Sequence, residues 1–173
     1  MKRSKLWIAL ALFIVCFSLL FWPREPVQQT EAERLSAEYA ASLGYTFVSY
    51  EGTFSYTLEK KMLTELPDMA VWSVMQVDPL LYIGKQIDVH KIMVTGHPLD
   101  DYPESLGKTS LALYFCQGRF VGGTSFPATS EALFGSPYSL DGKTLEELSG
   151  EDFQTWRTNW EQRYGTEQPM PTP

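Results

Sequence analysis

Residues 109–126 read TSLALYFCQGRFVGGTSF, and the fold expected for the chain follows from this segment. Its two halves, residues 109–116 and 119–126, are apolar and rich in residues that favour strands. Gln117 and Gly118 separate them, and glycine tolerates the positive φ that a tight hairpin turn requires. The stretch therefore predicts a β-hairpin.

Two more strands are expected upstream of this hairpin. Residues 45–50 are aromatic and β-branched, and Gly52 comes after them as an end signal. Residues 87–95 are also strand-like, but their apolar side chains change parity midway, which predicts a bulge near residues 90–91. The second half of the chain is therefore predicted to form an antiparallel sheet.

Helical patterns flank the expected strands. The first begins at a T-x-x-E capping box at Thr30 and ends at Gly44. Residues 57–77 repeat apolar side chains every three or four positions, with a break expected at Pro67. A final helix over residues 149–164 carries four aromatic side chains on one stripe, which we expect to dock on the core. Together these elements predict an α+β domain, with one mostly antiparallel sheet and helices packed on a face.

The N-terminus carries a different signal. Residues 6–22 are seventeen positions without a charge, which as a helix would span about 25 Å, near the thickness of a hydrocarbon core. Lys2, Arg3 and Lys5 precede this run and only Arg24 lies closely after it, so the positive-inside rule places the N-terminus in the cytoplasm.

These features divide the chain into four parts. We expect a cytoplasmic stub and transmembrane anchor at residues 1–22, a linker at 23–29, an extracytoplasmic domain at 30–165 and a disordered tail at 166–173. Small residues that would direct signal cleavage are missing after the apolar run, which favours an uncleaved, single-pass anchor in the cell membrane. A lipoprotein modified at Cys16 and a secreted protein are the alternatives.

Composition bounds the function. Apolar residues make up 44% and aromatic residues 14% of the chain, as in globular proteins. Residues 30–173 contain ten basic and twenty acidic side chains, a formal charge of −10. A field of that sign repels phosphate backbones, so nucleic-acid binding is not expected.

Cys116 is the one thiol in the expected domain, so no disulfide can form within it. It could act as a nucleophile with His90 or His97 as its base. It lies at the end of an apolar run, where a buried, inert thiol is the ordinary outcome. We expect no catalytic residue.

Two other groups of residues are weak binding candidates. His97, Asp100, Asp101 and Glu104 could gather around a calcium ion, although they do not have the paired spacing of a metal site. The pair Gly122-Gly123 superficially resembles a phosphate loop, but a bulge or the close approach of another backbone explains it better. No metal or cofactor is therefore expected.

Four segments together resemble a known family: YIGK (82–85), HPLD (97–100), GGTSFP (122–127) and YSLDGKTLEE (138–147). In this order they are similar to exported proteins of spore-forming Gram-positive bacteria that carry the domain of unknown function 4830. The likeness covers roughly residues 40–150. It implies a compact α/β domain behind an export signal or lipid anchor, and it supplies no catalytic residues.

Our leading hypothesis is a non-enzymatic domain that binds a protein or an envelope component, such as a cell-wall component, at the outer membrane surface. An extracytoplasmic enzyme that uses Cys116 with a histidine is the second hypothesis. A small-ligand or calcium sensor built on residues 97–104 is the third.

Overall fold

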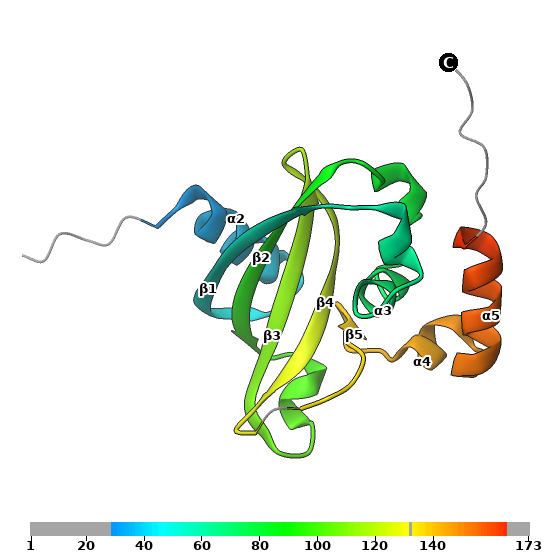
Figure 1. The fold of residues 1–173 in the computed structure, drawn as a ribbon. Coiled ribbons are helices and arrows are strands. Elements are labelled where there is room, and N and C mark those ends of the chain that lie inside the picture. The colour runs from blue at the N-terminus through cyan, green and yellow to red at the C-terminus, as the bar shows by residue number, and fades with distance from the viewer. Residues whose placement is uncertain (1–28, 132, 166–173) are drawn as a thin grey trace, which may run out of the picture.

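The computed structural model describes residues 29–131 and 133–165. Within them a five-stranded antiparallel sheet forms in the order β1-β2-β3-β4-β5, so every strand lies beside its neighbour in sequence (Figure 1). The strands are β1 (Thr46–Thr57), β2 (Gln86–Thr95), β3 (Ser105–Cys116), β4 (Arg119–Thr129) and β5 (Tyr138–Ser139). The predicted α+β class is confirmed.

The predicted anchor at residues 1–22, linker residues 23–28, Cys16 and the tail at 166–173 lie outside the described residues. In the part of the chain that is described, no helix combines the length and the hydrophobicity that crossing a bilayer demands.

The hairpin of residues 109–126 is confirmed as the β3–β4 pair. Gln117 and Gly118 have φ angles of 51° and 72°, and a two-residue type I′ turn requires positive φ at both central positions. Both strands are longer than predicted: β3 starts at Ser105 and β4 continues to Thr129.

Strand β1 does not end at Gly52, and that prediction is wrong. The strand continues to Thr57, and Gly52 lies inside it with a φ of 116°. Its pairing with β2 shifts between Phe47 and Ser49 and again between Tyr50 and Gly52. Glycine therefore allows a bulge here rather than a turn.

The bulge predicted in β2 at residues 90–91 is not there, since β2 pairs with β3 without a shift. Opposite Lys91 and Ile92 the β1–β2 pairing does shift, but the extra residue, Glu51, belongs to β1. The parity change has another cause, because each half of β2 is buried on a different face of the sheet. Ile87 and Val89 belong to one hydrophobic core, and Ile92 and Val94 to the other. A regular strand with two buried faces produces this pattern.

Helices accordingly cover both faces, whereas the sequence predicted helices on a face (Figure 1). One face packs against α2 (Glu31–Ser42), whose Ala40 is fully buried. The other packs against the 3-10 turn η1 (Lys60–Leu63), α3 (Asp68–Ser73) and α5 (Phe153–Tyr164). The remaining elements are η2 (Pro79–Tyr82), η3 (Pro98–Asp101) and α4 (Leu145–Ser149).

The helix predicted over residues 57–77 is much shorter in the structure. Thr57 belongs to β1, and only η1 and α3 are helical in this segment. They are separated near Pro67, as predicted, because proline cannot donate an interior hydrogen bond. Trp72 is nevertheless fully buried, and its indole nitrogen donates to the Tyr56 hydroxyl at 3.1 Å.

The aromatic stripe of α5 docks on the core as expected, except at Phe153, which is 40% exposed. Trp156 and Tyr164 are buried, and the Trp160 indole donates a 2.6 Å hydrogen bond to the Leu63 carbonyl. The helix begins later than predicted, since Asp152 is its N-cap and Ser149 ends α4. The Asp152 carboxylate accepts hydrogen bonds from the exposed N–H groups of the first turn.

Candidate functional site

His97 lies just after the end of β2 and is buried, with 3% of its surface exposed. Its Nδ1 lies 3.0 Å from the Leu99 N–H and accepts from it, so Nε2 carries the proton and donates to the Leu140 carbonyl at 3.1 Å. Both ring nitrogens are therefore engaged in structural hydrogen bonds.

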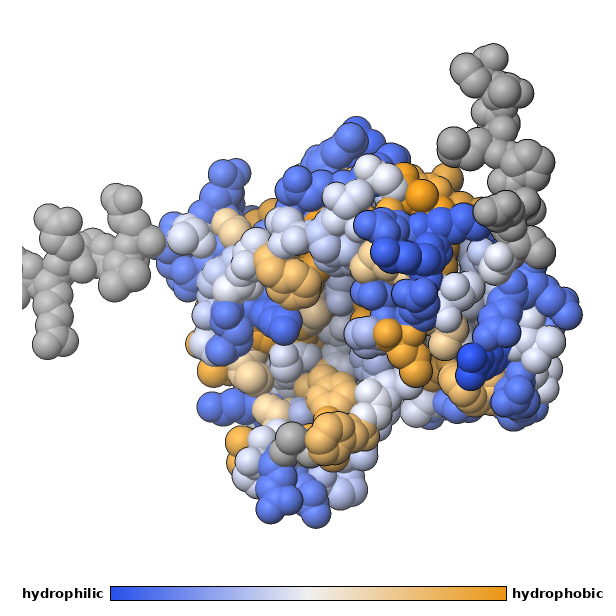
Figure 2. All heavy atoms as spheres, viewed as in Figure 1, coloured by the Kyte–Doolittle hydropathy of each residue, from blue (hydrophilic) through white to orange (hydrophobic). Residues whose placement is uncertain are grey.

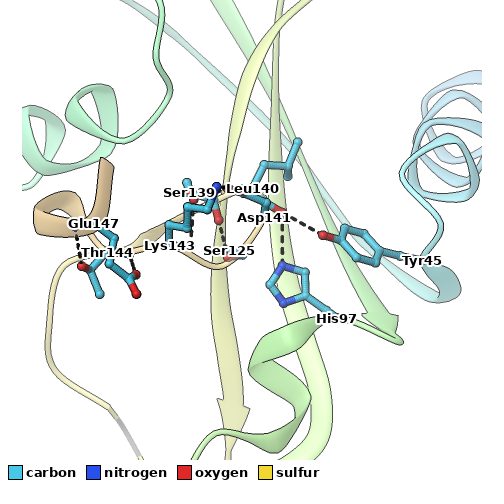
Figure 3. Close-up of polar contacts among 9 residues, drawn as sticks. All are labelled: Tyr45, His97, Ser125, Ser139, Leu140, Asp141, Lys143, Thr144 and Glu147. Carbon is cyan, nitrogen blue, oxygen red and sulfur yellow. Dashed lines mark hydrogen bonds and ion pairs between the residues drawn. The ribbon is translucent and has the colours of Figure 1, made fainter. Parts of the chain in front are cut away.

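These bonds hold residues 138–143, which we name the clasp loop, against the end of the sheet (Figure 3). The Tyr45 hydroxyl donates to the same Leu140 carbonyl at 3.3 Å, and the Ser125 hydroxyl donates to the Ser139 carbonyl at 2.6 Å. The Lys143 N–H donates to the Ser139 hydroxyl at 2.9 Å. The loop is thus fixed by side chains from several elements, and His97 serves it as a structural residue.

Burial lowers the pKa of His97, although the hydrogen bond to the Leu140 carbonyl opposes this effect. Burial likewise lowers the pKa of His90, a β2 residue whose ring contacts Ser36 of α2. The Ser36 hydroxyl donates to the Ala32 carbonyl at 2.7 Å, so His90 Nδ1, 3.0 Å from that hydroxyl, donates to it. The lowered pKa favours the neutral form of both rings.

Asp100 lies within η3 and completes a capping box whose N-cap residue is His97, so its carboxylate is used in structural hydrogen bonds. One carboxylate oxygen accepts from the N–H groups of Gly96 and His97, and the other accepts from the Thr109 hydroxyl at 2.7 Å. Asp101 and Glu104 are exposed. Over residues 29–131 and 133–165, no group of three histidine, cysteine or acidic side chains is placed to hold a metal ion.

Cys116 is buried in the core that packs against α3 and α5. Cys116 lies far from His97. Asp100, three residues after His97, contacts Thr109 in β3. Cys116 is seven residues further along the same strand, about 23 Å from Thr109. His90 packs on Phe115, whose ring belongs to the core of the opposite face. The structure does not bring Cys116 together with either histidine.

Gly122 and Gly123 are packing positions in β4. The pairing with β3 shifts between Tyr114 and Phe115, directly before Gly122, so a bulge is present. A Cβ at Gly122 would lie 3.0 Å from the Met75 Cβ, and one at Gly123 would lie 2.9 Å from a strand carbonyl and a leucine methyl. The bulge lies directly before the glycine pair, at Val121, and the predicted close approach of another backbone is confirmed for Gly123 alone.

A different feature lies at the other end of the sheet, where the β3–β4 turn approaches η2 and the start of β2. Two neighbouring hollows open there, which we name the hairpin groove. The first, of about 360 Å³, is lined by Leu81, Tyr82, Lys85, Cys116, Gln117, Arg119, Phe120 and Val121. The second, of about 430 Å³, is lined by Gly84, Lys85, Gln86, Asp88 and Gln117.

The hairpin groove combines apolar and cationic groups. Leu81 is 64% exposed, although leucine is ordinarily buried. The Lys85 ammonium lies 5.7 Å from the centre of the Tyr82 ring, and Arg119 extends from the first residue of β4. On the face that Figure 2 shows, hydrophobic residues reach the surface in separate patches among hydrophilic ones.

Of the sequence candidates, only Cys116 lines this groove. Sequence patterns do not mark Lys85, Gln117 and Arg119 as site residues, because no spacing rule joins a cation before one strand to a cation after a hairpin turn. The sequence signal that could have marked this site is a pair of basic side chains at strand ends in an otherwise acidic chain.

Comparison of the chain with family models, with curated proteins and with solved structures found no match.

Proposed function

We propose that this protein is a membrane-anchored, extracytoplasmic binding domain, and that it binds a protein or another envelope component through the hairpin groove. The observation that carries this proposal is the groove itself, an open, partly apolar concavity that includes an exposed leucine. Binding sites are commonly concave and apolar with a few polar groups, and exposed apolar side chains around a hollow favour such a role.

The placement at the outer face of the membrane rests on the sequence. The apolar run at residues 6–22, preceded by three basic side chains, favours a helix that stays in the bilayer and directs the rest of the chain to the outside. The resemblance to exported proteins with the domain of unknown function 4830 agrees with this placement and stays a prediction. Protease added to intact cells should digest residues 30–165, whereas an intact domain would refute the placement.

The dispersal of the polar candidates favours binding over catalysis. A nucleophile needs a base within hydrogen-bond reach, and neither His90 nor His97 is such a partner for Cys116 in the described residues. A Cys116→Ser variant is therefore expected to keep the biological effect of the protein. Loss of that effect in a correctly folded variant would favour the enzyme hypothesis.

Binding through the groove is tested with two exposed leucines. Leu81 in the groove is 64% exposed. Leu106 serves as the control because it is similarly exposed, at 60%, and lies at the other end of the sheet, near the start of β3. Neither substitution removes core packing, so Leu81→Ser and Leu106→Ser should both leave stability within about 0.5 kcal/mol of the native protein.

The full chain in detergent micelles is mixed with solubilised envelope, and captured material is compared with that of an acidic control protein. We expect capture to fall with Leu81→Ser and to persist with Leu106→Ser. Equal capture by both variants would contradict binding at this groove, and no capture above the control would contradict the binding function.

A further inference from the structure

The charge of the hairpin groove is opposite to that of the chain around it. Residues 30–173 carry a formal charge of −10, yet Lys85 and Arg119 line the same hollow. Among the described residues neither side chain forms an ion pair. Two cations without a carboxylate partner in a partly enclosed hollow attract an anionic group, and guanidinium matches a carboxylate or phosphate geometrically.

The two hollows of the groove differ in chemistry and share Lys85 and Gln117. The first hollow has apolar walls from Leu81, Phe120 and Val121. The second is polar, with the amide side chains of Gln86 and Gln117 beside Asp88. A ligand that fills both hollows therefore needs an apolar group, an anionic group next to it, and a neutral polar continuation.

The carboxylate of Asp88 disfavours one kind of anionic ligand, a polymer of phosphates. Its carboxylate accepts from the Ser55 hydroxyl at 2.6 Å and from the Gln86 amide at 2.8 Å, and these hydrogen bonds lower its pKa. The second hollow consequently holds a fixed negative charge at neutral pH. A polymer with a phosphate at every repeat would place one of its charges beside Asp88, which is unfavourable.

A peptide satisfies the same constraints. One apolar side chain fits the first hollow, a carboxylate in the neighbouring position meets the two cations, and backbone N–H groups can donate to Asp88 and to the Gln117 amide oxygen.

On the basis of the proposed binding function, we propose that the hairpin groove binds an acidic peptide segment of a partner protein, with an apolar side chain in the hollow beside Leu81 and an adjacent Asp or Glu carboxylate on Lys85 and Arg119.

The test uses the full chain in detergent micelles as bait for a library of short random peptides displayed on phage. The native protein should enrich sequences in which Asp or Glu adjoins Leu, Ile, Phe or Met. In the double variant Lys85→Gln/Arg119→Gln, this acidic enrichment should disappear, and an enriched peptide should bind roughly tenfold more weakly.

A matched control removes two positive charges elsewhere. Lys91 and Lys108 are exposed side chains outside the groove, so Lys91→Gln/Lys108→Gln changes the net charge equally. This control should keep the acidic enrichment and the affinity. Equal losses in both double variants would show a general charge effect and would overturn the proposal.

Inorganic polyphosphate serves as the competing probe. We expect it to displace an enriched peptide poorly from the native protein and better from an Asp88→Asn variant. Efficient displacement from the native protein would overturn the peptide assignment in favour of a phosphate polymer.

The outcomes separate this inference from the proposed function. If peptides are enriched for apolar residues alone and Leu81→Ser abolishes the enrichment, the groove binds proteins but the acidic specificity is wrong. If the native protein enriches no peptide, the acidic-peptide inference fails, and the envelope capture experiment with Leu81→Ser then decides the proposed function separately.

Discussion

Replacing His97 by Phe removes both hydrogen bonds of the ring while keeping a planar side chain of similar size. The Leu99 N–H loses its acceptor at a residue that is only 7% exposed. A buried donor without a partner costs about 1–3 kcal/mol. The Leu140 carbonyl loses one of two donors but keeps the Tyr45 hydroxyl, a loss of about 1 kcal/mol. We therefore expect the free energy of unfolding to fall by roughly 2–4 kcal/mol.

His90→Phe is the matched control. The ring of His90 is also buried, but its partner Ser36 keeps the Ala32 carbonyl as an acceptor when His90 is replaced. No donor is left without a partner, so the expected loss is about 1 kcal/mol or less.

Urea unfolding of the full chain in detergent micelles, monitored by tryptophan fluorescence, measures both variants. Trp72 is fully buried and Trp156 nearly so, so exposure of the cores changes the signal. Comparable losses for the two variants, or a smaller loss for His97→Phe, would refute the assignment of His97 to the clasp loop.

The same contacts support three more predictions. Gly123→Ala should destabilise the domain by about 1–3 kcal/mol, because the added Cβ would lie 2.9 Å from a strand carbonyl; an unchanged melting temperature would contradict this. Asp100→Ala should cost about 1–3 kcal/mol and Asp101→Ala less than about 0.5 kcal/mol, since the first carboxylate accepts three hydrogen bonds, two of them partly buried; calcium should shift the melting temperature of neither variant nor of the native protein. Burial lowers the pKa of His90 and His97 in the folded protein. As the pH falls below about 6.5, the unfolded chain therefore binds protons before the folded protein does. The free energy of unfolding should decrease from that pH until the lower folded-state pKa values are reached. The slope of the unfolding free energy against pH, measured between pH 7 and pH 5, should flatten in the variant that replaces both histidines by Phe. An identical slope would assign the pH dependence to other groups.

Candidate sites are harder to predict than strands. The sequence marks His97 and Asp100 as a polar pair in one segment, but their hydrogen bonds to the clasp loop and to Thr109 depend on partners as many as 43 residues away. Sequence spacing carries no information about such partners. In the sequence alone, a buried and fully hydrogen-bonded histidine therefore cannot be distinguished from a histidine that binds a metal ion.

Features that a few adjacent residues control can be predicted from the amino-acid sequence. The Gln117-Gly118 turn, the Thr30 cap and the break near Pro67 result from local backbone preferences, and they are present in the structure. The acidic charge of the chain outside the apolar run at residues 6–22 is likewise a property of composition alone.

Which faces of the sheet are buried, and where a groove opens, depends on tertiary packing. The parity change in β2 reflects helices on both faces of the sheet, which depends on how distant segments pack rather than on β2 itself. The hairpin groove forms only where residues 81–88 meet residues 116–121. Burial and concavity arise from contacts between segments far apart in the chain, and these contacts exist only after the chain has folded.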